Sequence, residues 1–267
     1  MAQDSLWLGS LRKPIRSAAI GFGVITALIY AYMVFGQLAF EDPIGMHEMI
    51  RPAGRPLVAV MLLAILGTFV CASLYLSDTK GAIESQPNGF FDVLSLVTSR
   101  MAMMMTALIV LVMFYEVVAR YVFGQPTLWA NELSLWLAAF VFLFAGQYAM
   151  QQRSHIRIYV IYDMMPRWAQ KSADVFSTVL IVLFAVAMIW GGYTDAVTRM
   201  MRMETFGTAW DPPIPGVVKP AILFIIALVA VQAVSNLISD WHKAPEHLAH
   251  DDIDEIEIEN IRKTLEQ

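Results

Sequence analysis

Long apolar runs alternate with short polar stretches over most of the chain. Six runs are long enough to cross a bilayer, since a helix needs about 20 mainly apolar residues to span about 30 Å of hydrocarbon. The runs cover residues 17–40, 57–76, 91–123, 133–150, 175–197 and 217–238. None shows the strict apolar–polar alternation of a membrane β-barrel strand. We therefore predict an all-α polytopic bundle with about six transmembrane helices.

The first run follows three basic residues and so mimics a secretory signal sequence. Arg12, Lys13 and Arg16 precede it. A signal sequence has an apolar core of roughly 7–15 residues, and this run is much longer. No clear small-x-small cleavage site follows it. We expect a retained first helix.

The polar stretches between the apolar runs predict loops that connect the transmembrane helices. The stretch 77–88 contains charged residues and Pro87, and the stretch 198–219 contains Pro212, Pro213, Pro215 and Gly216. We expect these prolines to exclude a continuous helix through the second stretch and to be confined to loops and helix starts. The basic stretch 151–171 is expected to include a short interfacial segment.

The composition agrees with a membrane location. Hydrophobic residues make up 58% of the 267 residues and charged residues 15%, against roughly a quarter charged in soluble chains. The net charge of −5 comes from the end of the chain, where nine acids and three bases follow from Asp240 onward and leave +1 for the rest. No basic patch of the kind that neutralises phosphates is present, so a nucleic-acid partner is excluded.

Basic residues in the short loops predict the orientation, because lysine and arginine concentrate on the cytoplasmic side. With both termini in the cytoplasm, the inside carries about twice as many basic residues as the outside. The strongest single signal is the stretch 151–171, which contains Arg153, Arg157, Arg167 and Lys171. We therefore expect both termini to be cytoplasmic.

Residues that carry catalytic or metal chemistry are scarce. The five histidines (His47, His155, His242, His247 and His250) all lie outside the apolar runs, which argues against a haem-binding bundle. The single cysteine, Cys71, has no companion for a metal site. Phosphate-binding glycine loops and hydrolase or metalloprotease signatures are missing. We expect no catalytic residue, no cofactor and no metal site.

The centres of the runs are uncharged, which bears on transport. Transport sites in membranes use broken helices or ionisable groups near the midplane. Here the main polar residues within the runs are Gln37, Gln147 and Gln232, and such glutamines more often bond a neighbouring helix. A chain that crosses six times without a polar pathway is typical of a scaffold.

One charged cluster lies at the end of the third run. Glu116 and Arg120 are four residues apart on one helix face, in the favourable order for an ion pair, and Glu132 begins the next run after a short loop. The cluster has two interpretations. It is either an ion pair that ends the helix or a polar junction between this subunit and another. We expect Arg120 to pair with both acids and so to hold the third and fourth runs together.

Several short motifs follow one another in a characteristic order along the chain. They are EVVARYVF at 116–123, WANEL at 129–133 with Trp136, GQYA at 146–149, HIRI at 155–158 and the proline-rich AWDPP at 209–213. With these motifs, the chain from about Met101 to Ser239 resembles the small membrane subunit of tripartite ATP-independent periplasmic (TRAP) transporters.

The resemblance implies a domain organisation and a function. Residues 86–240 would form the family's four-helix domain, preceded by a two-helix extension (1–85) and followed by an acidic cytoplasmic tail (241–267). A periplasmic binding protein would deliver a substrate, usually an organic acid. A large permease would carry it across the inner membrane by sodium symport, and this chain would brace the large subunit.

The charged cluster and the proline-rich loop provide the candidate contact residues. The candidate subunit interface or structural ion cluster consists of Glu116, Arg120, Trp129 and Glu132, and the candidate periplasmic loop contact of Trp210, Asp211, Pro212 and Pro213. Two alternatives stay open at this point: a membrane subunit of a quinone-linked or other membrane enzyme, and a self-sufficient small carrier.

Overall fold

The computed structural model describes residues 5–39, 44–51, 55–79, 84, 86–87, 89–153, 162 and 164–241. The described part contains helices and no strands: η1 (Gly9–Leu11), α1 (Arg12–Ala39), α2 (Met46–Ile50), α3 (Pro56–Ser77), α4 (Phe90–Tyr121), α5 (Ala130–Gln151), α7 (Arg167–Met201) and α8 (Ile214–Asp240). Six of them are long and apolar enough to cross a membrane. The predicted all-α bundle of six spans is confirmed in these respects.

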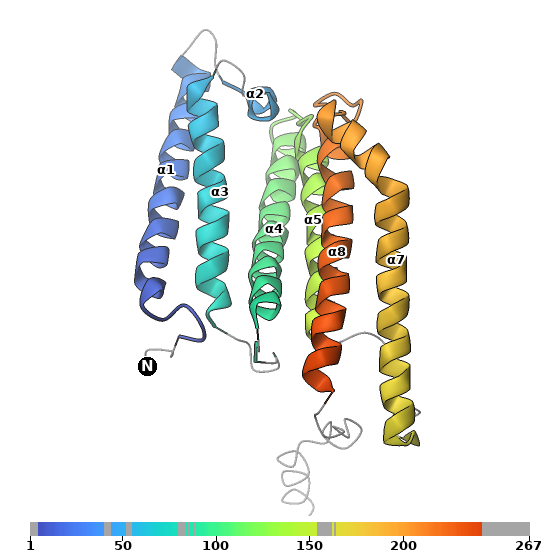
Figure 1. The fold of residues 1–267 in the computed structure, drawn as a ribbon. Coiled ribbons are helices and arrows are strands. Elements are labelled where there is room, and N and C mark those ends of the chain that lie inside the picture. Colours follow the sequence, from blue (N-terminus) through green and yellow to red (C-terminus); the bar gives the residue numbers. More distant parts are fainter. Residues whose placement is uncertain are drawn as a thin grey trace, which may run out of the picture.

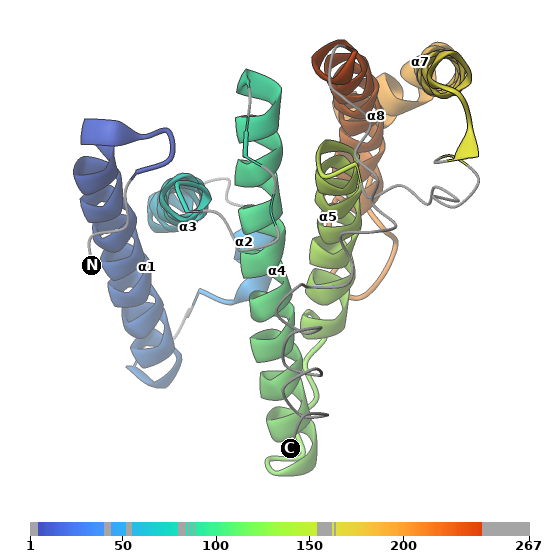
Figure 2. The same cartoon turned by 90° about the horizontal axis from the view of Figure 1, so that it is seen from below.

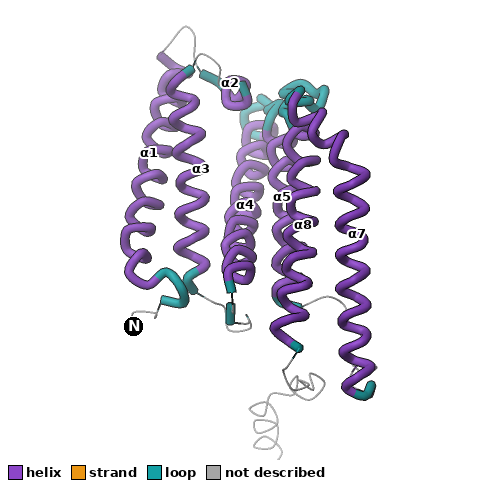
Figure 3. Tube along the Cα trace, viewed as in Figure 1, coloured by secondary structure: helices purple, strands orange, loops and turns teal. Residues whose placement is uncertain are grey.

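The long helices stand in a row and form three hairpins (Figures 1 and 2). In spatial order they are α1, α3, α4, α5, α8 and α7, and each packs on the next in this order. The loops and turns gather at two ends, which we call the upper and lower ends as they stand in Figure 1 (Figure 3). Both ends of the chain's described part lie at the lower end.

The predicted loop over residues 198–219 is too long, because α7 continues to Met201 and α8 begins at Ile214. Helix α8 begins at Ile214, with Pro215 in its first turn. Proline is tolerated there because the first-turn N–H groups have no intrahelical acceptor. Pro220 lies inside α8, so the prediction that proline is confined to loops and helix starts is wrong. Its missing N–H leaves one intrahelical bond unmade.

Gly216 explains how this helix start packs so tightly. Its amide donates to the carbonyl oxygen of Glu204 at 3.2 Å. A Cβ at this position would lie 3.0 Å from the Glu204 amide nitrogen and 3.2 Å from the Arg199 carbonyl oxygen. Glycine therefore allows the backbone that follows α7 to lie directly against the first turn of α8.

Helix α7 is longer than its apolar run. The predicted span covers residues 175–197, whereas the helix covers Arg167–Met201. At 1.5 Å per residue its 35 residues extend about 52 Å, well beyond the hydrocarbon thickness. The polar turns at both of its ends are helical because a helix started by an apolar run continues at little cost.

Three sequence predictions fall outside the described residues. They are the HIRI motif at 155–158, residues 154–161 and 163 of the stretch in which an interfacial segment was proposed, and the acidic tail after residue 241.

Candidate functional site

Glu116 is the centre of the predicted charged cluster. It lies in the last turns of α4 at the upper end and is only 4% exposed. Arg120, one turn further along, donates from Nε at 2.9 Å and from a terminal nitrogen at 2.5 Å, both to Oε1. The ion pair that the four-residue spacing predicts is present.

The other oxygen of Glu116 holds the loop between α4 and α5. The backbone N–H of Thr127 donates to Oε2 at 2.9 Å, and the Thr127 hydroxyl donates to the same oxygen. The hydroxyl oxygen accepts a long bond from the Ala130 amide at 3.4 Å, at the start of α5. Glu116 therefore ties the end of one span to the start of the next.

Glu132 was expected to share Arg120 with Glu116, and the structure does not bring them together. No ion pair joins Arg120 to Glu132 in the described part of the chain; Arg120 pairs with Glu116, whose second oxygen is taken by Thr127. In the described part of the chain, Oε2 of Glu132 is buried and has no hydrogen-bond partner.

Trp129 belongs to an exposed apolar surface around this cluster. Its ring stacks on Tyr115 with 5.8 Å between ring centres. Five large side chains near the tip of the α4–α5 hairpin are two-thirds or more exposed: Phe114, Tyr121, Val122, Phe123 and Leu128. We call these five residues, together with Arg120 and Trp129, the hairpin tip. The hairpin tip combines an apolar surface with a half-exposed guanidinium.

The loop residues Trp210 and Asp211 contact the N-terminal part of this same chain. Trp210 is 4% exposed, and its indole N–H donates to the Met46 carbonyl oxygen in α2 at 2.8 Å. Arg51, just after α2, pairs with Asp211 at 3.0 Å. The amide of Gly207 and the hydroxyl of Thr205, helped by the charge of Arg51, hold the pKa of Asp211 below its ordinary value.

The two prolines of the same loop have internal roles as well. Pro212 is fully buried, and its carbonyl oxygen accepts a bond from the Phe206 amide at 3.0 Å. Pro213 precedes α8 as its N-cap residue. All four candidate loop residues are therefore engaged within the chain, which the sequence reasoning did not anticipate.

A second ionic group at the upper end joins α7 to α8. Lys219 of α8 lies 2.5 Å from Asp195 of α7, and Arg199 donates to the other oxygen of Asp195 at 2.8 Å. Arg199 also pairs with Glu204 in the loop. Lys219 thus links two spans.

At the lower end, an ionic group that sequence reasoning missed joins the extension to α4 and α5. Arg100 of α4 donates to Oε2 of Glu84 at 2.5 Å and to the Thr79 carbonyl oxygen at 3.2 Å. Tyr148 of α5 donates its hydroxyl proton to Oε1 of Glu84 at 2.8 Å. Glu84 and Arg100 are 11% and 13% exposed. The only sequence signal was an acid in the linker that precedes the arginine.

Asp78, at the same end, binds residues of the N-terminal segment that precedes and begins α1. Its side chain is fully buried, and Oδ1 accepts bonds of 2.9 Å from the Ser5 hydroxyl and from the Trp7 and Leu8 amides. Arg12 lies 3.3 Å from Oδ2. Burial alone would raise the pKa of Asp78, but these donors and the charge of Arg12 outweigh it and hold the pKa below its ordinary value.

The glutamines within the spans behave differently from one another. Gln232 of α8 donates to Asp92 of α4 at 2.7 Å and to Asn236 at 2.9 Å, as expected of a helix-bridging glutamine. The Gln147 side chain is fully buried and its amide has no hydrogen-bond partner in the described structure. The side chain of Gln37 lies outside the described residues.

The described residues contain no group of three histidine, cysteine or acidic side chains that could hold a metal ion. The side-chain clusters found are ion pairs and hydrogen bonds that connect helices near the two ends of the bundle. They can fix the helices relative to one another and present surfaces to a partner.

Comparison with known proteins gives one match. The family model described as tripartite ATP-independent periplasmic transporters, DctQ component, matches residues 109–243, just over half of the 267 residues. The matched range begins inside α4 and leaves out α1, α2 and α3. No curated protein and no solved structure matches the chain.

Proposed function

Because the chain belongs to the family of the DctQ component of tripartite ATP-independent periplasmic transporters, we propose that it is the structural small permease subunit of such a transporter. Members of the family are transporter components, and this chain is a multi-pass membrane protein. In the proposal, the chain braces the large permease during sodium-driven uptake of an organic acid that a periplasmic binding protein delivers.

The observation that carries the proposal is the placement of charge within the described spans. Ion pairs lie near the upper end at Glu116–Arg120 and Asp195–Lys219, and near the lower end at Glu84–Arg100 and Arg153–Asp240. A translocation pathway needs ionisable or unwound backbone groups near the midplane. Charges that are paired at the ends support a scaffold instead.

We place contact with the large permease at the hairpin tip. Its exposed side chains offer apolar surface, and Arg120 keeps half of its side chain exposed while it holds Glu116. Arginine and aromatic side chains are enriched where protein partners bind.

The two-helix extension of residues 1–85 would enlarge this scaffold. It is held to the rest of the chain at both ends, by Trp210 and Asp211 at the upper end and by Arg100 and Tyr148 at the lower end. Helix α3 also packs along α4. Because two ends are tied, we expect the extension to move with the rest of the chain as one body.

We also propose the inner membrane as the location and the lower end as the cytoplasmic side, from the arginines and lysines of the short loops. Single cysteines in a Cys71→Ser background test the orientation. Cysteines at Gln125 and Thr208, at the upper end, are expected to react with an impermeant thiol reagent added outside. One at Gln86, at the lower end, is expected to stay unreactive, and the reverse pattern would contradict the orientation.

Copurification tests the function itself. The affinity-tagged full chain, extracted from native membranes in mild detergent, is expected to retain a large permease that mass spectrometry identifies. Recovery of the chain alone, or with redox-enzyme subunits, would refute the proposal. A hairpin-tip variant, Phe123→Glu, is expected to lose the permease, while the same change at the exposed Phe90, the first residue of α4 at the lower end, serves as control.

A further inference from the structure

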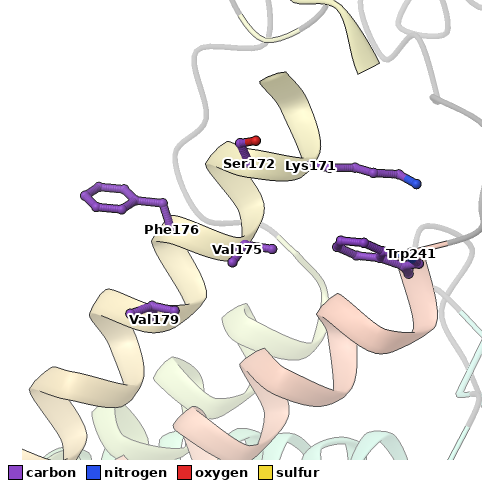
Figure 4. A pocket seen from close by; sticks show the side chains of 6 residues that line it. All are labelled: Lys171, Ser172, Val175, Phe176, Val179 and Trp241. Atoms are coloured by element: carbon purple, nitrogen blue, oxygen red, sulfur yellow. The ribbon is translucent and has the colours of Figure 1, made fainter. Parts of the chain in front are cut away.

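A slot between the lower ends of α7 and α8 is separate from the candidate interface at the upper end. Its volume is about 370 Å³, and six residues line it: Lys171, Ser172, Val175, Phe176, Val179 and Trp241 (Figure 4). This volume is in the range of small-molecule sites, about 300–1,000 Å³. The walls are mainly apolar, and polar groups lie at the lower end.

Two hydrogen-bond donors stand at the polar end of the slot. The Lys171 ammonium lies 4.8 Å from the centre of the Trp241 ring, a cation–π contact that holds both side chains at the mouth. In the described part of the chain neither the ammonium nor the indole N–H donates a hydrogen bond, and Lys171 makes no ion pair. An anionic group at the mouth would therefore meet a positive charge and a free indole donor.

The residues at the slot are those expected at the depth where a lipid headgroup meets its acyl chains. Trp241 follows the last residue of α8, and Asp240 beside it pairs with Arg153 at the end of α5. Tryptophan and basic residues favour this interfacial level. Val179 lies eight residues beyond Lys171, so the apolar wall extends about 12 Å along α7 towards the hydrocarbon.

From this arrangement we propose that the slot binds an anionic glycerophospholipid, with its phosphate at Lys171 and Trp241 and one acyl chain along Val175, Phe176 and Val179. Charge complementarity at the mouth and an apolar wall below it match the two parts of such a lipid. A lipid there would connect the lower ends of α7 and α8, whereas the ion pair between Asp195 and Lys219 connects the two helices at the upper end. The proposal rests on the six spans and not on the proposed subunit role.

Binding to defined lipids tests the proposal on the purified full chain. Native mass spectrometry with dioleoylphosphatidylglycerol is expected to show one preferred adduct that dioleoylphosphatidylcholine does not form. Lys171→Glu changes the charge at the mouth by two units, which is expected to weaken phosphatidylglycerol binding by about thirtyfold. The control Lys13→Glu makes the same change at an exposed site at the lower end and is expected to leave the preferred adduct intact.

A second variant separates the slot from simple surface charge. Val179→Trp fills the apolar wall without changing the charge and is expected to reduce the same adduct. Phosphatidylglycerol brominated on its acyl chains is also expected to quench the fluorescence of Trp241 more strongly than brominated phosphatidylcholine does. The Trp241 contribution is the part of the fluorescence that is missing in Trp241→Phe. Thermal melting of each variant checks that the fold is intact.

Three results would overturn the proposal. One is equal binding of the two lipids to the wild-type chain. Another is unchanged phosphatidylglycerol binding in both Lys171→Glu and Val179→Trp. The third is binding that arises only after removal of residues 242–267, which would identify the acidic tail as the occupant of the slot.

Discussion

Removing Glu84 is expected to destabilise the whole chain, because its carboxylate joins three segments. Arg100 and Tyr148 donate to its two oxygens at 2.5 and 2.8 Å, and both charged partners are nearly buried. Hydrogen bonds to charged groups contribute about 1.5–3 kcal/mol each, and breaking a buried ion pair from one side costs about 3–5 kcal/mol. Arg100 keeps its bond to the Thr79 carbonyl, so we expect about 3 kcal/mol for Glu84→Ala.

Equilibrium unfolding in mixed micelles, driven by a denaturing detergent and followed by tryptophan fluorescence, measures this loss. Tyr148→Phe removes one donor and is expected to cost about 1–2 kcal/mol. The control Tyr193→Phe removes the same oxygen from an exposed tyrosine of α7 and is expected to change nothing measurable.

The double variant Glu84→Ala with Arg100→Met separates an ion pair from two independent contributions. If the two residues act on each other, the double variant loses less stability than the sum of the single variants, by about 1–3 kcal/mol. Strict additivity would refute the reasoning, because it would mean that neither residue depends on the other. Wild-type stability of Glu84→Ala would refute it equally.

Three further predictions concern the other contacts. The pKa of Asp78 is lowered in the folded chain, so the stability that its carboxylate contributes is complete above the unfolded pKa of about 3.9 and is lost as pH falls through the lower folded pKa. A nitroxide spin label in η1 should therefore become mobile only in that acidic range, and Asp78→Asn should abolish the transition. Trp210→Ala is expected to cost about 3–5 kcal/mol in the same unfolding assay, because the side chain is buried, whereas Trp190→Ala in exposed α7 should cost far less. Arg120→Ala is expected to reduce copurification of the large permease more than Glu132→Ala, because it leaves the buried Glu116 without its cation; equal wild-type recovery would leave only a helix-end ion pair.

The existence of the six helices was predictable because length and apolarity alone decide it. Helix ends were less predictable, as α7 and α8 show. Arg167–Lys171 and Ile214–Lys219 contain polar residues or proline, yet both segments are helical. Proline in the first turn loses nothing, and an established helix adds further turns readily. A prediction from local composition therefore places the start of a helix too late in the chain.

The site was predictable where its contacts are local. Glu116 and Arg120 share a helix face by helix geometry, and their ion pair followed from spacing alone. Thr127 donates to Glu116 through both its backbone N–H and its hydroxyl, and no spacing rule in the sequence marks this contact across the loop. Trp210 meets a carbonyl oxygen 164 positions away, and Tyr148 meets a carboxylate 64 positions away. Such pairings depend on how the hairpins pack.

The part of the chain outside the family match is where sequence reasoning was least informative. It assigned two spans to residues 1–85 but no contact between them and the rest. The structure adds contacts at both ends, through Met46 and Arg51 above and Glu84 below. These contacts are the physical basis for treating the extension as part of the scaffold.

Sodium-driven uptake into proteoliposomes tests the central claim most directly. The assay compares vesicles that contain this chain alone, the copurified large permease alone, and both together, each with the soluble binding protein loaded with substrate outside. The account predicts uptake only when both membrane proteins are present. Uptake by this chain alone, or equal uptake by the large permease without it, would contradict the account.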